Sequence, residues 1–234
     1  MEAHQFKIRK QKAVEESISP YWEGLGLDLS KTIIKQVDYK VAEKIILEYE
    51  WLKCMPAIVK YCYGIFFDDV CGGVVVFSNE YSENTGVWDK YEFTNKMILL
   101  SRGVCLHWTP KNTGSKLIMG AIKLLPKEYE VVTCTVDELA GEVGTIYQAC
   151  NFIYTGVMRK RANRLGVLID GKTYGSRTIR KRIGTIKKEE ILKHWPNAEF
   201  ITQKSKARYF LFRKNQKKHL NSIKDLIKPY PKRG

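Results

Sequence analysis

An aspartate and a tyrosine, ten positions apart, are the side chains of this sequence whose spacing best suits joint chemistry. Asp137 follows the β-branched run 131–136, which is typical of a buried strand, and Tyr147 lies in a short helix-like stretch after Gly141 and Gly144. A carboxylate at a strand end and a phenol on the next helix can meet above one sheet edge, where α/β proteins often bind ligands. The alternative interpretation is that Asp137 caps the following helix and Tyr147 is a core aromatic.

The elements that would position this pair alternate between strands and helices. Neighbouring strands early in the chain pair antiparallel, and the later strand–helix–strand passage is a parallel crossover. The sequence therefore predicts an α/β fold with a mixed, mostly antiparallel central sheet flanked by helices. Strands are expected over residues 32–37, 61–67, 70–78, 96–108 (interrupted at 101–103), 131–136 and 152–158, and helices over 38–51, from about 116 to 125 and around Tyr147.

The charge of the chain is divided unevenly along its length. Residues 157–234 hold 23 Lys and Arg against 5 Asp and Glu, whereas residues 1–156 hold 17 against 20. Such asymmetry points to a polyanionic partner, most simply double-stranded DNA, although a solvated basic tail is the alternative. The candidate phosphate contacts are Arg177, Arg180, Lys181, Arg182, Lys187, Lys188, Lys204, Lys206 and Arg208.

Composition limits the class of protein further. Hydrophobic residues make up 44% of the 234, which is enough for a real core, and the apolar runs are too short and too often charged to span a membrane. Six cysteines without a C-x-x-C pair favour free thiols in a reducing cytoplasm. Four scattered histidines give no metal-ligand spacing, so the sequence indicates no metal-binding residues and leaves open whether a metal is required.

The change in composition predicts two parts. We expect a catalytic domain over residues 1–158, with an N-terminal arm over 1–28, and a basic extension over 159–234. The extension contains a possible hairpin around Asp170-Gly171, then a basic helix-like stretch, and a strand over 207–212 that belongs either to its own small sheet or to the main one.

A polar turn precedes the helix expected from about residue 116, and the segment Tyr-x-x-x-Asn-Phe precedes the last strand of the expected catalytic domain. With this order of elements, the chain resembles the GNAT N-acetyltransferase fold. In that family, backbone amides of the corresponding turn bind the pyrophosphate of acyl-coenzyme A at a helix N-terminus. The matching residues are Lys111, Asn112, Thr113, Gly114, Ser115 and Lys116. Lys116 stands where the family pattern expects a small residue, which leaves coenzyme A, another anionic donor and a simple phosphate all open.

A closer resemblance rests on three segments, KYCYGIFFDDVCGGVVVF, MILLSRGVCLHW and TVDELAGEVGTIYQACNFIYTG. In this order they resemble the Mom family of phage DNA-modification proteins, a divergent branch of the same fold. Members of that family add a carbamoylmethyl group to the exocyclic amine of adenine, which blocks restriction. Carried over to matching positions, the resemblance implies functional roles for Arg102, Asp137 and Tyr147, with Ser101 beside them.

The residues suit such a reaction. Asp137 is suited to accept the amine proton, Tyr147 to protonate a leaving group, and Arg102 to hold an anionic donor or developing negative charge. The alternative for Arg102 is a structural ion pair with a nearby carboxylate. Trp51, Tyr91 and Trp108 are candidates for stacking on an unpaired base, although core packing explains each equally well.

These observations support a phage or prophage transferase that modifies DNA with a small-molecule donor. The first alternative is an acyl-coenzyme A-dependent N-acyltransferase that acts on a tRNA, a nucleotide or a basic protein. The second is a DNA-binding protein without catalysis. The sequence leaves the donor, the DNA sequence context and the oligomeric state open.

Overall fold

The structure is a computed structural model, and it describes residues 2–18, 20–80, 86–157, 165–202 and 205–232. Within these ranges, seven strands form the main sheet in the order β1-β2-β3-β4-β5-β10-β6. Neighbouring strands are antiparallel except β4 and β5, which run parallel. The bounds are β1 (Ile33–Gln36), β2 (Tyr61–Phe67), β3 (Val70–Ser78), β4 (Met97–Cys105), β5 (Val131–Val136), β6 (Ile153–Gly156) and β10 (Ala207–Phe212).

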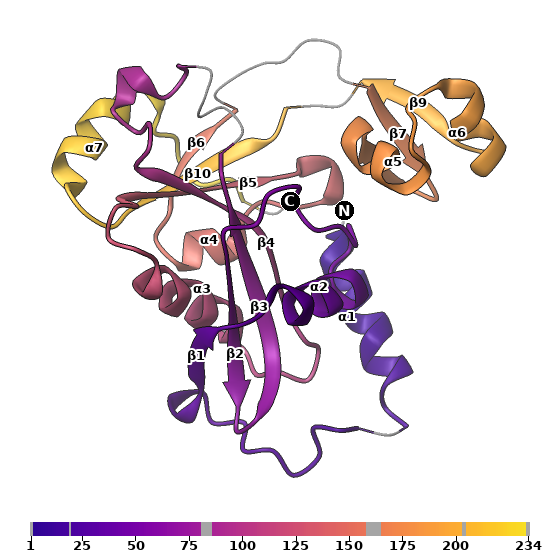
Figure 1. Cartoon of the computed structure of the whole chain (residues 1–234), viewed down its shortest axis with the longest axis horizontal. Helices are drawn as coiled ribbons and strands as arrows, with labels where there is room; N and C mark the ends of the chain where they lie inside the picture. The colour runs from indigo at the N-terminus through magenta and orange to yellow at the C-terminus, as the bar shows by residue number, and fades with distance from the viewer. Residues whose placement is uncertain (1, 19, 81–85, 158–164, 203–204, 233–234) are drawn as a thin grey trace.

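Helices cover both faces of this sheet (Figure 1). The helix α2 (Tyr39–Tyr49) packs on one face, and α3 (Thr113–Leu124) and α4 (Thr145–Ala149) pack on the other. Because side chains alternate along a strand, Ile65 belongs to the core cluster under α3 whereas Cys62 belongs to the cluster under α2. The predicted fold class, a mixed and mostly antiparallel α/β sheet flanked by helices, is confirmed.

An additional helix, α1 (His4–Glu15), occupies the expected N-terminal arm and packs beside α2. Only His4 and Ile8 of α1 are buried, so its sequence carries little of the periodic apolar signal that predicts a helix. Among the described residues, no helix combines the length and apolar content that a membrane crossing requires. The other helical segments are α7 (Gln216–Ile223) and the short turns η1 (Leu29–Lys31), η3 (Asp89–Tyr91), η4 (Glu138–Ala140) and η5 (Lys224–Leu226).

A small three-stranded sheet, in the order β8-β7-β9, stands beside the main one. The expected hairpin at Asp170-Gly171 joins β7 and β8, and both residues have the positive φ (48° and 72°) that such tight turns require. The buried cluster of this subdomain includes Trp51 and Leu52 of the main domain, so the two parts share a core. Its elements are β7 (Leu165–Ile169), β8 (Lys172–Gly175), α5 (Ser176–Ile183), α6 (Lys188–His194) and β9 (Glu199–Thr202).

The C-terminal part of the chain returns to the main sheet. Strand β10 lies between β5 and β6, although it was expected within a basic extension over 159–234. Its residues Ala207, Tyr209 and Phe210 are fully buried, which is typical of a central strand covered on both faces. The expected boundary at residue 158 therefore differs from the arrangement of the strands, in which the small sheet spans only 165–202.

Candidate active site

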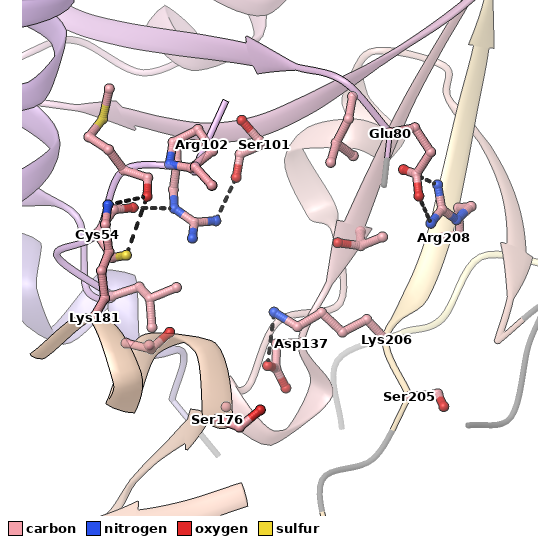
Figure 2. A pocket seen from close by; sticks show the side chains of 18 of the residues that line it. Cys54, Glu80, Ser101, Arg102, Asp137, Ser176, Lys181, Ser205, Lys206 and Arg208 are labelled. Carbon is pink, nitrogen blue, oxygen red and sulfur yellow. Dashed lines mark hydrogen bonds and ion pairs between the residues drawn. The ribbon is translucent and has the colours of Figure 1, made fainter. Parts of the chain in front are cut away.

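A pocket opens where β4 and β5 separate. The two strands pair only from Met97 to Leu99 and from Val131 to Thr133; beyond these residues β4 continues along β3 and β5 along β10. The pocket measures about 960 Å³ and is walled by β4, the end of β5, the segment before β2, the segment before β4, and helix α5 (Figure 2). This volume is within the range of small-molecule sites in proteins.

A β-bulge places Ser101 and Arg102 in the pocket together. The register between β3 and β4 shifts between Val76 and Phe77, so Ser101 has no partner of its own on β3. Successive side chains of a regular strand point to opposite faces, and the bulge relaxes this rule. Strand β4 therefore continues through the interruption expected at residues 101–103, and the bulge at this position brings both residues to one cavity.

The guanidinium of Arg102 is held by backbone carbonyls. Its Nε donates to the carbonyl oxygen of Cys54 at 2.6 Å, and Nη1 donates to that of Ser101 at 2.7 Å. Among the described residues, no carboxylate oxygen lies within 4.0 Å of it, so the expected alternative of a structural ion pair is absent there. The positive charge of Arg102 therefore faces the pocket without a bonded counter-charge.

Asp137 lies at the end of β5 and lines the pocket, with an exposed fraction of 7%. Its Oδ1 accepts a hydrogen bond from the backbone N–H of Leu139, so it caps the short helix η4, as the alternative interpretation expected. Its Oδ2 pairs with the ammonium of Lys206 at 3.2 Å. Asp137 therefore has both roles, as a cap and as a pocket residue.

Two glutamates near Asp137 gave no signal in the sequence. Glu142 accepts from the backbone N–H of Asp137 at 3.0 Å and from the indole Nε1 of Trp51 at 3.1 Å, and burial raises its pKa. Glu50 is buried behind the same wall, and burial raises its pKa to about 7 despite the nearby charge of Arg102. These carboxylates come from segments far apart in the sequence, which is why no local motif indicates them.

The N-terminal helix α1 supports the same wall. The side-chain amide of Gln5 donates to the carbonyl of Tyr49 at 2.8 Å, and its oxygen accepts from the backbone N–H of Trp51 at 3.0 Å. The ring of His4 lies edge-on to Trp51, with centroids 5.1 Å apart, and burial lowers the pKa of His4. The arm thus fixes the segment that carries Trp51 into the pocket.

Tyr147 does not line this pocket. Its ring packs against Phe152 and Tyr209, with centroids 5.5 and 5.7 Å away, as part of the core under α3. Burial, and then Cys134 and Glu142, raise the pKa of its phenol well above 10, and Arg102 acts in the opposite direction. The structure therefore places Tyr147 behind the pocket wall and does not bring it face to face with Asp137.

The expected phosphate-binding turn, residues 111–116, also lies outside the pocket. The ammonium of Lys116 donates to the carbonyl of Leu29, and a Cβ added at Gly114 would approach Cδ1 of Ile146 to 2.5 Å. Lys111 and Asn112 are exposed, so the turn lies at the surface of the main domain. The structure thus does not bring this turn and Asp137 into one cavity.

The candidate phosphate contacts differ in whether they line the pocket. Four of them line it, namely the exposed residues Arg180 and Lys181 of α5 together with Lys206 and Arg208. Three more, Arg182, Lys187 and Lys188, are exposed on the small subdomain outside the pocket lining. Arg177 lies in α5, and Lys204 lies outside the described residues.

Arg208 is not available for a phosphate. It forms a two-pronged pair with Glu80, at 2.9 and 3.2 Å, donates to the hydroxyl of Thr133 at 3.0 Å, and lies over the ring of Trp88. The sequence contains no sign of this pairing because Glu80 follows β3 whereas Arg208 lies in β10, far along the chain. Because its guanidinium is already paired, Arg208 is no longer a candidate DNA contact.

The three aromatic residues expected to stack on a base do not all lie at the pocket. Trp51 and Tyr91 line the pocket, together with Trp88, which the sequence analysis did not single out. Trp108 packs against Phe67 in another cluster. Among the described residues, no group of three or more His, Cys, Asp and Glu side chains could hold a metal ion.

The class of fold has counterparts among solved structures. An acetyltransferase from Bacillus subtilis in complex with CoA is 15% identical, with a TM-score of 0.39, and the match covers 78% of this chain and 99% of that one. An N-acetyltransferase from Staphylococcus aureus is 12% identical, with a TM-score of 0.43, over 78% and 98% of the two chains. The diaminobutyrate acetyltransferase of Paenibacillus lautus is 6% identical, with a TM-score of 0.38, over 78% and 95%.

The family follows from the sequence comparison. Residues 31–232 match the Mom protein family, and this span includes the pocket residues of both sheets. The chain therefore belongs to the Mom protein family, as its three segments predicted. No curated protein matches it.

Proposed function

We propose that this protein is a phage- or prophage-encoded transferase that adds a small, carbamoylmethyl-like group to the exocyclic amine of adenine in DNA and so protects the DNA from restriction. Its site of action would be the cytoplasm of the bacterial host. The observation that carries the proposal is one pocket, in a chain of the Mom protein family, lined by Ser101, Arg102 and Asp137 and also by cations of the basic C-terminal part.

The chemistry needs a proton acceptor next to the amine. The amine of adenine is a weak nucleophile because its lone pair is delocalised into the ring. In the proposed step, the amine nitrogen forms a bond to an electrophilic carbon of the donor, while the bond from that carbon to its leaving group breaks and the electron pair departs with the leaving group. Asp137 accepts the amine proton, and Arg102 stabilises the negative charge that develops on the donor.

The target amine lies inside a duplex, whereas Asp137 is buried in the pocket wall, with an exposed fraction of 7%. A duplex cannot enter such a cavity, so the adenine must leave the base stack before it reaches Asp137. The aromatic residues of the wall, Trp51, Trp88 and Tyr91, support this proposal because base–aromatic stacking offsets part of the cost of unstacking.

Nucleoside mass spectrometry tests the proposed reaction. Plasmid DNA from bacteria that express the chain should contain adenosine with an added mass, and Asp137→Asn should abolish it while keeping the cap to Leu139. The matched control is Asp225→Asn, which removes an exposed carboxylate in η5. Unmodified nucleosides, together with acylation of a tRNA, a nucleotide or a protein amine, would contradict the proposal and favour an N-acyltransferase.

DNA as the partner has a separate test. Neutralising exposed cations of the small subdomain, as in Arg180→Gln or the pair Lys187→Gln and Lys188→Gln, should weaken duplex binding. Each true phosphate contact should lower the slope of log K against log salt by about 0.9. Lys193→Gln is the control, because Lys193 pairs with Glu190 at 2.7 Å. Identical slopes for all variants would exclude these residues as contacts.

A further inference from the structure

Two cations of the pocket are anchored on neighbouring carbonyls of one short segment. Arg102 reaches from β4 to the carbonyl oxygen of Cys54 at 2.6 Å, and Lys181 reaches from α5 to that of Met55 at 3.0 Å. Figure 2 shows both side chains on the same side of the pocket, facing the Cys54 segment. The main domain and the small subdomain thus each supply one positive charge to a single spot.

These two charges differ from those of Lys206 and Arg208, which also line the pocket. Lys206 pairs with Asp137 at 3.2 Å and Arg208 with Glu80 at 2.9 Å, so each has a carboxylate partner. Among the described residues, neither Arg102 nor Lys181 has a carboxylate within 4.0 Å. An anion bound between Arg102 and Lys181 would be attracted by both of these positive charges.

Glu50 does not supply the missing counter-charge for Arg102 and Lys181. It is the buried carboxylate that interacts with the charge of Arg102, but one of its oxygens accepts from the backbone N–H of Leu52 at 3.1 Å. Burial raises its pKa to about 7, so near neutral pH it carries only part of a negative charge. The geometry therefore leaves the Arg102–Lys181 wall open to an anion from the ligand.

We propose that Arg102 and Lys181 form an oxyanion subsite that binds a phosphate or carboxylate group of the ligand. The subsite rests on the proposed function, because the ligand is either the extruded nucleotide or the group donor. The second amino group of the guanidinium and the remaining N–H groups of the ammonium supply the donors. Asp137 lies on another side of the pocket, so a ligand held here by its anionic group extends its reacting part toward the carboxylate (Figure 2).

Calorimetric titration of the full chain with inorganic phosphate, at constant ionic strength, tests the subsite. Lys181→Gln and Arg102→Gln should each weaken phosphate binding by about tenfold, as expected for the loss of one charged hydrogen bond. Lys193→Gln, with its cation elsewhere on the small subdomain, should bind like the parent chain. Circular dichroism checks folding, and Lys181→Gln is the safer variant because Arg102 also holds two carbonyls. Equal phosphate binding in all variants would overturn the subsite.

A second titration distinguishes the two sources of the anion. Duplexes with native phosphates around the target adenine are compared with duplexes that carry neutral methylphosphonates there. If the subsite takes the DNA phosphate, the affinity lost through Lys181→Gln disappears on the neutral duplex. If it takes the donor, Lys181→Gln weakens inorganic phosphate binding alone, and DNA does not compete with phosphate. If Lys181→Gln lowers the affinity for both duplexes equally and leaves the binding of inorganic phosphate unchanged, the proposed subsite is overturned.

These measurements do not depend on turnover. A chain that binds phosphate through Arg102 and Lys181 but leaves adenine unmodified would keep the subsite and reject the reaction. A chain that modifies adenine with an unaltered phosphate affinity in Lys181→Gln would keep the reaction and reject the subsite.

Discussion

The two faces of the main sheet differ most where β4 and β5 separate. On one face, Ser101, Arg102 and Asp137 line the pocket; on the other, Tyr147 and Tyr209 pack with the core residues under α3. Alternation along β5 makes this division, because its even-numbered residues from 132 to 136 belong to the core whereas Thr135 and Asp137 line the pocket. Residues that are close in sequence, such as Asp137 and Tyr147, can thus lie on opposite faces of the sheet, and the proposed reaction belongs to the pocket face.

The largest expected effect is on the pocket face. Asp137→Asn should lower the rate of adenine modification by about 10²–10⁴-fold, since a positioned proton acceptor contributes that much. The amide oxygen still caps Leu139, so the thermal unfolding midpoint should change little. Single-turnover assays on duplex DNA measure the rate. A variant that retains a tenth of the parent rate would show that Asp137 is not the acceptor.

The second largest expected effect is on stability and concerns the ion pair of Arg208 with Glu80, which we expect to have a structural role in the pocket wall. Arg208→Met should lower the free energy of unfolding by about 3 kcal/mol or more, because it leaves the buried Glu80 without its partner. Chemical denaturation measures the loss. The double variant Arg208→Met with Glu80→Met should recover much of it, because no uncompensated charge then remains. Full stability of the single variant would contradict a structural role for the pair.

Because of Glu50, we expect the stability of the folded protein to depend on pH. Its pKa is raised from 4.5 to about 7 in the folded protein, so between these values the folded state binds more protons than the unfolded state. Its contribution to stability is present below pH 4.5 and is lost as the pH rises to about 7, by roughly 3 kcal/mol. Relative to Glu50→Gln, the parent chain should lose stability over this window, and Glu128→Gln should match the parent. Parallel curves for the parent and Glu50→Gln would contradict the burial effect.

The sequence predicted most strands and the hairpin at Asp170-Gly171, because local patterns determine these features. A local pattern also indicated Asp137 at the end of a strand, whereas Ser101 and Arg102 came from the family resemblance. The sequence left open whether the strand over 207–212 joins the main sheet, as β10 does. It could not predict the position of β10 between β5 and β6, since pairing of strands far apart in the chain leaves no local signal. For the same reason it missed the pairing of Arg208 with Glu80 and the contact of Lys206 with Asp137.

Tyr147 shows where the reasoning from spacing fails. The short helix α4 does position the phenol near β5, as expected, but the loop between residues 137 and 144 carries the chain from the pocket to the other face. A resemblance of motifs gives the order of residues and not the face to which each side chain points.

The smallest expected effect is that of a substitution at Tyr147, and it tests most directly whether the two faces of the main sheet differ in function. Tyr147→Phe should leave the modification rate within about threefold of the parent, because the phenol lies behind the pocket wall, and it should change the free energy of unfolding by about 1 kcal/mol at most. If Tyr147 protonates the leaving group, the rate should instead fall by about 10²–10⁴-fold. Single-turnover assays beside Asp137→Asn separate these outcomes. A loss as large as that of Asp137→Asn would mean that the two faces communicate through the gap between β4 and β5, and that the donor approaches from the side of α3.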